Sequence, residues 1–430
     1  MRNKIGIQTA VAVVVANMIG TGVFTSLGFQ LADIQSVFVI LMLWLVGGIT
    51  ALCGALTYGE LGAALPRSGG EYHFLSSIYH PSIGFVAGWV SATVGFAAPT
   101  ALVAMTFGEY LEGAFPQLNK TWLAVGLLLL IAAVHTQSLQ SGGRFQRLFT
   151  AMKVLLILAF IGLAFVFDQP QPLSLLPRPE DLSMLFSPAF AVSLIYVSYA
   201  FTGWNAATYL INELKHPRRN LPLALLAGTA VVAVLYLLLN YAFMRAAPTD
   251  ALVGKVEVGY IAAVYMLGPE GGKWMSLLLA MLLISTASAM IFAGPRVLMV
   301  MGEDLRMFRF LSKKNARGVP ATAILFQSVL SLLFVLTGSF KAVLLYAGFV
   351  LAATTFVTVA GVYVLRIRQP QLPRPYKTWG YPFTPFIYLL LVGWTLVFLL
   401  VREPRESLSG LATLLAGWLI YQLGRKGKLW

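Results

Sequence analysis

The stretch at residues 17–24, "NMIGTGVF", interrupts an otherwise continuous apolar run near the start of the chain. It places an asparagine, two glycines and a threonine where a membrane helix would be most regular. Lipid offers no hydrogen-bond partners, so a helix broken at membrane depth must be buried in protein or line a wet cavity. Gly20 and Gly22 permit an unwound backbone and the close approach of a ligand. We therefore interpret this stretch as a break in the first spanning helix.

The composition of the whole chain places it in a membrane. Of its 430 residues, 58% are hydrophobic and 11% are charged, and the mean hydropathy is +0.80. These values lie outside the soluble globular range. A spanning helix needs about 20 mostly apolar residues. The sequence therefore predicts an all-α membrane protein with twelve spans, at about 5–32, 36–64, 84–113, 121–139, 145–167, 186–212, 221–246, 273–301, 320–337, 341–366, 382–401 and 408–423.

The charge pattern predicts the orientation. The net charge is +14, but the basic residues are scattered over loops, and no soluble basic domain is left to hold a nucleic acid. When the loops are taken alternately, most lysines and arginines fall on one side. By the positive-inside rule that side is cytoplasmic. We expect a multi-pass protein of the cell membrane with both termini in the cytoplasm.

A second interruption lies in the sixth predicted span, at "YAFTGWNAATYL", residues 199–210. Its Thr202, Gly203 and Asn205 lie at the depth of the first break, five spans later and in a helix of opposite direction. Two broken helices in corresponding positions of two inverted halves indicate a transporter with its site at the midplane, as in the LeuT-type arrangement. We expect five-helix repeats at 1–167 and 186–366, followed by a helix pair at 382–423.

The two breaks offer opposite partial charges. Burying a carboxylate costs several kcal/mol, and a helix N-terminus returns at most about 2 kcal/mol, so several direct hydrogen bonds must act together. The predicted anion cradle consists of the amides of Thr21, Gly22 and Val23. The predicted cation cradle consists of the carbonyls of Met18, Ile19, Ala200, Phe201 and Gly203. Such a pair of cradles fits a zwitterion.

Four side chains at the breaks are candidates for contacting the variable part of a substrate: Thr21, Phe201, Trp204 and Asn205. Simple helix packing is the alternative for the two aromatic residues. No acidic residue stands within either break, which favours a substrate with a neutral side chain.

Five stretches together resemble the amino acid-polyamine-organocation superfamily of permeases, in particular the L-type amino acid exchangers and their bacterial relatives. They are "NMIGTGVF", "ELGAALPRSGGEYHFL", "FTGWNAATYLINELKHPRRNLP", "GPRVLMVMGED" and "RPYKTWGYPFTP". The family more often has serine or alanine where Thr21 stands. The resemblance implies transport of an α-amino acid, with Phe201 as an aromatic gate. It also implies alternating access, with spans one, two, six and seven moving against three, four, five, eight, nine and ten.

Lys153 is a charge within the fifth span, about eight residues from its cytoplasmic start. A lysine near the bilayer centre costs about 2.5–3.5 kcal/mol. At about 12 Å depth its side chain could extend back to the interface. The resemblance implies instead that its ammonium lies between spans one and eight, where related transporters hold sodium, which would make transport sodium-independent. Proton coupling through Lys153 is a further hypothesis.

The resemblance also suggests an inner gate. Glu60 and Glu213 lie near the cytoplasmic ends of spans two and six, and Arg67 or Arg296 could pair with them. Local interfacial salt bridges are the alternative. His135 has no metal partners at ligand spacing, so we expect a satisfied interior histidine.

Several classes of protein are disfavoured. The chain has no H-E-x-x-H, G-x-S-x-G or G-x-x-x-x-G-K-[ST] motif, so we expect no enzyme, no cofactor and no metal site. Its one cysteine, Cys53, lies within a span, and the loop "AFPQLNKT" at 114–121 has none. Because eukaryotic L-type exchangers bind a heavy chain through a cysteine in that loop, we expect no disulfide-linked partner. A channel, a proton-coupled amino acid permease and a cationic or polyamine symporter remain as alternatives.

Overall fold

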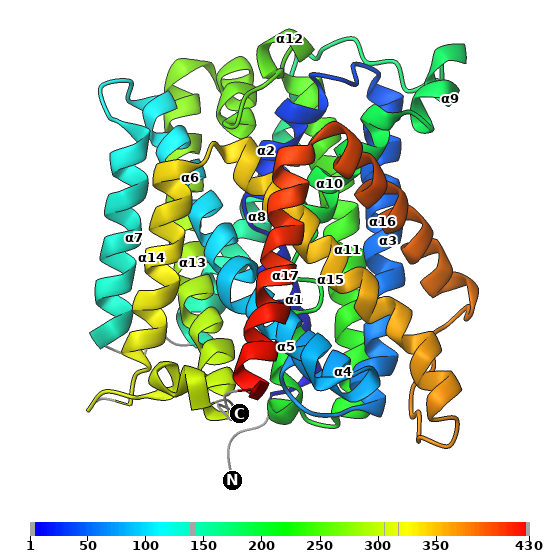
Figure 1. The fold of residues 1–430 in the computed structure, drawn as a ribbon. Coiled ribbons are helices and arrows are strands. Elements are labelled where there is room, and N and C mark those ends of the chain that lie inside the picture. Colours follow the sequence, from blue (N-terminus) through cyan, green and yellow to red (C-terminus); the bar gives the residue numbers. More distant parts are fainter. Residues whose placement is uncertain (1–4, 138–142, 305, 317, 427–430) are drawn as a thin grey trace.

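The computed structural model describes residues 5–137, 143–304, 306–316 and 318–426. These residues are almost entirely helical and contain no β-strand ladder. Most helices run between the two ends of the molecule, side by side (Figure 1). The first helix, α1 (Ile7–Met18), begins at the same end at which the last helix, α17 (Pro404–Lys426), finishes.

The number of membrane spans follows from helix length and composition. In the described ranges, 10 helices or broken helices are long and apolar enough to cross a membrane. The pair α9 (Pro179–Leu185) and α10 (Pro188–Ala200), bent by 63°, raises this number to 11. The apolar helix α14 (Ala321–Thr337) is shorter, with 17 residues. The all-helical membrane fold is confirmed, whereas twelve spans remain a prediction, and the end of predicted span 121–139 lies outside the described residues.

The first half of the chain contains an interruption that the sequence did not predict. A π-helical turn, η1, over Ser91–Gly95 separates two helices in the predicted span 84–113. Pro99 has no amide for the Gly95 carbonyl, which removes the α-helical hydrogen bond there. The other helices of this half are α2 (Gly22–Gln30), α3 (Val37–Ala64), α4 (Gly70–Ile78), α5 (Pro81–Val90), α6 (Ala97–Ala114), α7 (Lys120–Gln137) and α8 (Gly143–Val166).

The second half contains the longest helix, α13 (Val258–Asp304), which begins before the predicted span 273–301. It changes direction at Gly268, whose φ of 74° a helix does not allow. The remaining elements are the 3-10 helix η2 (Ala206–Glu213), α11 (Pro217–Ala246), α12 (Thr249–Leu252), the 3-10 helix η3 (Arg306–Ser312), α15 (Phe340–Arg368) and α16 (Phe383–Arg402).

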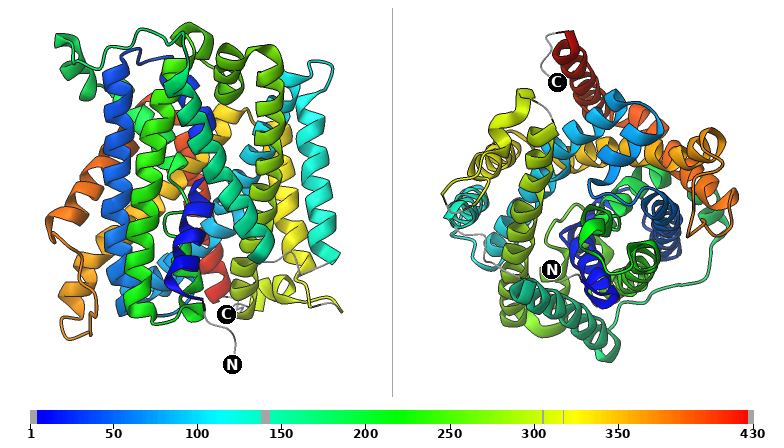
Figure 2. Two further views of the ribbon diagram at one scale, coloured as in Figure 1. Left: turned by 180° about the vertical axis from the view of Figure 1, so that it is seen from behind. Right: turned by 90° about the horizontal axis from the view of Figure 1, so that it is seen from below.

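The broken helices lie in the interior of the bundle. α11 packs against both α1 and α3, and α13 packs against α6. Seen along the bundle, α1, α3 and α11 form one group, and α5 and α13 lie outside it (Figure 2, right). Helix α7 is peripheral and exposes Trp122, Leu129 and Leu130, which lipid would cover. The breaks are therefore shielded from lipid, as their composition predicts.

Candidate functional site

The first break consists of residues 19–21, between the end of α1 at Met18 and the start of α2 at Gly22. The first amides of a helix have no acceptor in their own helix. In the described chain, the amides of Thr21, Gly22 and Val23 donate to no backbone carbonyl outside α2. That these amides hold an anion stays a prediction, and Thr21 and Gly22 are the two of the three residues that line the cavity described below.

The second break consists of residues 201–205, between the end of α10 at Ala200 and the start of η2. Gly203 has a φ of 104°, which favours glycine. A Cβ atom there would lie 2.7 Å from the Asn17 carbonyl oxygen. Glycine at this position thus permits contact with the end of α1. The second half of this span is a 3-10 helix, which the sequence did not predict.

The two breaks meet in the interior of the bundle. The Tyr236 hydroxyl on α11 donates to the carbonyl oxygens of Met18, at 2.6 Å, and Ala200, at 3.2 Å. One side chain therefore joins the ends of α1 and α10. Sequence reasoning missed Tyr236, because a tyrosine in the apolar span 221–246 gives no sign of where its hydroxyl points.

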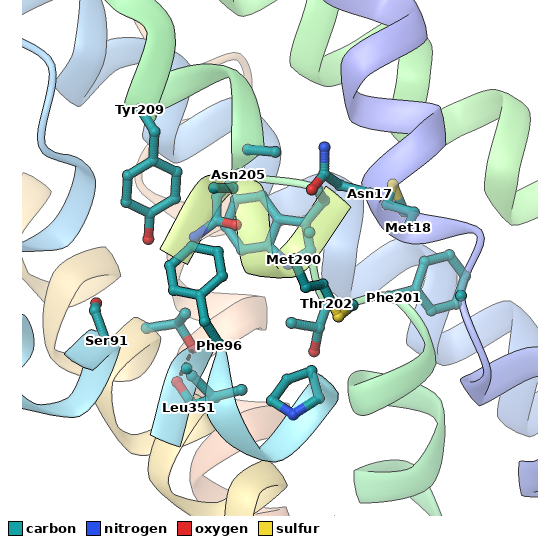
Figure 3. Close-up of a pocket in the computed structure, with 18 of the residues that line it drawn as sticks. Asn17, Met18, Ser91, Phe96, Phe201, Thr202, Asn205, Tyr209, Met290 and Leu351 are labelled. Carbon is teal, nitrogen blue, oxygen red and sulfur yellow. Dashed lines mark hydrogen bonds between the residues drawn. The ribbon is translucent and has the colours of Figure 1, made fainter. Parts of the chain in front are cut away.

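Both breaks line one cavity of about 450 Å³. Its wall includes most of the predicted binding residues: Met18, Thr21, Gly22, Ala200, Phe201, Gly203, Trp204 and Asn205. Figure 3 shows the end of α1, at Asn17 and Met18, and residues of the second break around the same space as Ser91, Phe96, Met290 and Leu351. Ile19 and Val23 are not on this wall, and both are fully buried. Their side chains face protein, and the predicted roles of the Ile19 carbonyl and the Val23 amide, which are backbone groups, stay predictions.

The carbonyls of the predicted cation cradle already accept hydrogen bonds, but only Met18 has both acceptor positions filled. Met18 accepts from Tyr236 and from the Gly20 amide, at 2.8 Å, which fills both acceptor positions of its oxygen. The other four carbonyls each accept a hydrogen bond: Ile19 from Lys153, Ala200 from Tyr236, Phe201 from the Trp204 amide and Gly203 from the Ala206 amide.

Two residues of the cavity wall, one in each break, have carbonyls that are free of backbone partners. The carbonyls of Gly20 and Thr202 accept no backbone hydrogen bond from the described residues. They are further candidates for holding a cationic group, beside those predicted.

The aromatic residues of the second break are both on the cavity wall and packed. The Phe201 ring lies 5.1 Å from the Tyr236 ring and 6.3 Å from the Trp44 ring, between centroids. The Trp204 ring meets Tyr58 edge-on, at 4.6 Å. Packing and contact with a ligand are thus combined in the same side chains.

Lys153 lies between the first break and α13. Its ammonium donates to the Thr286 hydroxyl, at 2.6 Å, and to the Ile19 carbonyl, at 3.3 Å. The side chain is only 4% exposed. It does not extend to the membrane interface, so that alternative is wrong. The position is the one that the family resemblance implies.

The predicted inner-gate pairs do not form among the described residues. Glu60 is fully buried and accepts from Arg366, at 2.7 and 2.8 Å. Its other partners are Arg374, at 3.5 Å, and the Thr378 amide, at 2.7 Å. Glu60 thus faces α15 and the segment that follows it, not the predicted arginines.

The other three members of the predicted gate also lie elsewhere. Arg67 and Glu213 are exposed, and Glu213 forms no ion pair with a described side chain. The Arg296 guanidinium lies over the Phe292 ring, 4.0 Å from its centroid, and lines the cavity. Glu213 is nevertheless close enough to Arg296 for an electrostatic interaction, without a salt bridge, so this pair stays a prediction.

Sequence reasoning missed Glu71, at the start of α4. This buried carboxylate lines the cavity and accepts from Asn205, at 2.6 Å, Tyr209, at 2.6 Å, and Tyr58, at 3.0 Å. The expectation that nothing acidic lies at the breaks is therefore wrong. Glu71 follows two glycines in a predicted loop, and only the fold brings it beside the second break.

His135 is a satisfied interior histidine, as predicted. It is buried, and its Nε2 atom lies 2.8 Å from the Ser288 hydroxyl. Within the described ranges, no group of three or more histidine, cysteine, aspartate or glutamate residues could hold a metal ion.

A helical membrane bundle in which two broken helices meet at a central cavity defines a transporter of the LeuT-type class. Comparison with known sequences narrows this class. The sequence model of the family described as "Amino acid permease" matches residues 5–421. The chain belongs to this amino acid permease family, whose members are transporters and not enzymes.

Curated relatives cover nearly the whole chain. The Large neutral amino acids transporter small subunit 2 of Mus musculus is 30% identical over 440 residues, which cover 99% of this chain and 81% of the relative. The b(0,+)-type amino acid transporter 1 of Mus musculus is 28% identical over 433 residues, covering 98% and 88%. The Asc-type amino acid transporter 1 of Mus musculus is 28% identical over 441 residues, covering 99% and 81%. The chain is thus a multi-pass membrane protein of amino acid transport.

Proposed function

We propose that this protein exchanges neutral L-amino acids across the cell membrane by alternating access, without sodium. One observation carries the proposal: two helix breaks meet at a single cavity, and they include amides and carbonyls that have no backbone partner among the described residues. That arrangement suits a zwitterion, because each end of the molecule meets its electrostatic complement.

The two charged groups of the substrate would bind at different edges of the cavity. The amides at the start of α2 would hold the carboxylate. The carbonyls of Gly20 and Thr202 would receive the ammonium group, since they accept no backbone hydrogen bond in the described chain. Phe201, Trp204 and Asn205 would contact the substrate's side chain.

Sodium independence rests on Lys153. Its ammonium supplies a fixed positive charge that bridges the first break and α13. A cation bound beside the Ile19 carbonyl would compete with that charge. Lys153 would also hold the non-helical part of the first span in place without an ion.

A neutral substrate side chain is favoured by the charges around the cavity. The Glu71 carboxylate is already occupied by three donors, and Arg296 lies on the same wall. A cationic side chain would therefore meet a partly neutralised surface. The printed name of one relative, which refers to large neutral amino acids, agrees with this preference.

The proposed mechanism moves one group of helices against another. Repeats at 1–167 and 186–366 would each supply one broken helix, and 382–423 would lie outside them. α1, α2, α3, α10, η2 and α11 would rock against the remaining helices of the repeats, with both chain termini in the cytoplasm. The grouping of α1, α3 and α11 in Figure 2 supports this division.

We also propose that the protein functions without a disulfide-linked partner. Cys53 is the one cysteine of the sequence, and it is buried in α3. It cannot reach a second chain without unfolding that helix. The "small subunit" in the printed name of a relative belongs to that protein.

Counterflow in liposomes tests the proposed function. Purified protein is reconstituted into vesicles loaded with unlabelled leucine or alanine, and uptake of the labelled amino acid is followed in sodium and in choline buffer. We expect saturable uptake that requires the internal amino acid and is equal in both buffers. Uptake that requires an inward proton gradient would favour the proton-coupled permease. Flux that does not saturate would favour a channel. Competition by arginine or spermidine, and by no neutral amino acid, would favour a cationic or polyamine symporter.

A further inference from the structure

We propose that Glu71 is a positioning residue of the substrate site. Its carboxylate anchors the second half of the second broken span and thereby fixes where Asn205 meets the cavity. The inference rests on the proposed function only in assigning a substrate to that cavity. The anchor itself is a property of the fold.

Three hydrogen bonds carry the inference. The Oε1 atom of Glu71 accepts from the Asn205 amide group, at 2.6 Å, and from the Tyr58 hydroxyl, at 3.0 Å. The Oε2 atom accepts from the Tyr209 hydroxyl, at 2.6 Å. Two of these donors flank the start of η2, and the third lies on α3. The carboxylate therefore joins η2 to α3 and α4 at one point.

The backbone before Glu71 is shaped to receive the same helix. Gly69 and Gly70 have φ values of 133° and 53°, which favour glycine. A Cβ atom on Gly70 would lie 2.4 Å from the Cε1 atom of Tyr209. The glycine pair thus lets the Tyr209 ring lie against the turn while its hydroxyl reaches Glu71. This close approach is a second observation, independent of the hydrogen bonds.

The second half of this broken span needs such an anchor. The break over 201–205 separates η2 from α10, and a 3-10 helix has poorer hydrogen-bond geometry than an α-helix. The Tyr58 ring also packs against Trp204, which lies in the break. Asn205 and Tyr209 both face the cavity region (Figure 3). A shift of η2 would therefore move groups that line the substrate site.

Glu71 holds its partners by hydrogen bonds and forms no ion pair with a described side chain. This separates two possible roles. A glutamine at position 71 could still accept from Asn205 and Tyr58 through its oxygen, and its amide could donate to the Tyr209 oxygen. It would preserve an anchor and abolish a charge. An alanine would abolish both.

The test compares Glu71→Ala, Glu71→Gln and Tyr209→Phe with Tyr346→Phe, which loses a hydroxyl bonded to Thr413; neither residue lines the cavity. Uptake in proteoliposomes gives KM and kcat. We expect Glu71→Ala to raise KM about tenfold, with a smaller change in kcat. We expect Glu71→Gln and Tyr209→Phe to raise it about threefold or less, and Tyr346→Phe to leave it unchanged. Equal effects of alanine and glutamine would overturn the positioning role in favour of the charge.

A second measurement does not depend on transport. A spin label is attached at Asn212→Cys, on the exposed face of η2, in a Cys53→Ala background. We expect Glu71→Ala to narrow the spectrum, which reports greater mobility of η2, and Tyr346→Phe to leave it as in the parent. An unchanged spectrum in Glu71→Ala would refute the anchoring role of Glu71, whichever substrate the protein transports. A narrowed spectrum in a protein that transports no amino acid would refute the proposed function alone.

Discussion

Gly22 and Ala200 are in backbone contact across the two broken spans. A Cβ atom on Gly22 would lie 2.4 Å from the Cα atom of Ala200 and 3.1 Å from its amide nitrogen. Neither backbone atom can turn away as a flexible side chain would. This contact therefore sets the separation of the breaks, and with it the width of the cavity between them.

The first prediction concerns that contact. Replacing Gly22 by alanine forces the α2 and α10 segments apart, so we expect amino acid uptake to fall more than about tenfold. Gly126→Ala is the matched control, because a Cβ atom at Gly126 in α7 meets nothing within 4 Å. Uptake per reconstituted protein decides the matter. Wild-type uptake by Gly22→Ala would contradict the close packing of the breaks.

The second prediction concerns Tyr236, whose hydroxyl joins the carbonyls of Met18 and Ala200. Tyr236→Phe removes both hydrogen bonds, and we expect it to lower the free energy of unfolding by about 1–2 kcal/mol. Uptake should fall about tenfold, because the ends of α1 and α10 are no longer joined. Thermal unfolding in detergent and uptake are measured together.

Tyr346→Phe provides the comparison for Tyr236→Phe. It also loses a hydroxyl hydrogen bond, at 2.7 Å to Thr413, but outside the cavity wall. We expect a comparable or smaller loss of stability with uptake unchanged. If both variants lose uptake equally, Tyr236 has no special part in the site.

The third prediction tests Lys153. Lys153→Ala leaves the Ile19 carbonyl and the Thr286 hydroxyl without their charged donor. We expect uptake to fall at least about tenfold. Lys341→Ala, which removes a half-exposed lysine paired with Glu403, should keep wild-type uptake. An unchanged rate and pH profile in Lys153→Ala would remove Lys153 from the mechanism.

The fourth prediction concerns the ion pair that joins α3 to α15. Arg366→Met leaves the fully buried Glu60 with Arg374 and the Thr378 amide. We expect the free energy of unfolding to fall by up to about 3 kcal/mol. This value is at the low end of the cost of breaking a buried ion pair, because Arg366 is 22% exposed. Lys120→Met, in a surface cluster with Lys120 47% exposed, should cost about 1 kcal/mol or less. Equal melting temperatures of the two variants would show that burial of Glu60 adds nothing.

The arrangement of the site was only partly predictable. The glycines and polar residues at 17–24 and 199–210 revealed both breaks, because lipid tolerates such residues only where protein surrounds them. Of the carbonyls predicted for the cation cradle, Met18 has both acceptor positions filled, and the others stay predictions. Which carbonyl is free depends on Tyr236 and Lys153, whose polar ends arrive from other helices.

The carboxylates of Glu60 and Glu71 were also only partly predictable: the sequence gives their positions, and the fold gives their partners. Glu60 and Glu71 flank the same turn in sequence, and neither position indicates a partner. The fold directs Glu60 to Arg366 on α15 and Glu71 to Asn205 and Tyr209 near η2. These partners lie far along the chain, and a change in helix rotation would replace them.

The amino acid sequence by itself determined that this chain is a helical membrane protein with two interrupted spans. Apolar length and local backbone freedom are properties of short segments, and the bilayer acts on each segment separately. Only the tertiary structure decided which amides and carbonyls remain free, where Lys153 points and what Glu71 holds. Those outcomes depend on side-chain directions across helix interfaces, where a difference of one residue in register exchanges every contact.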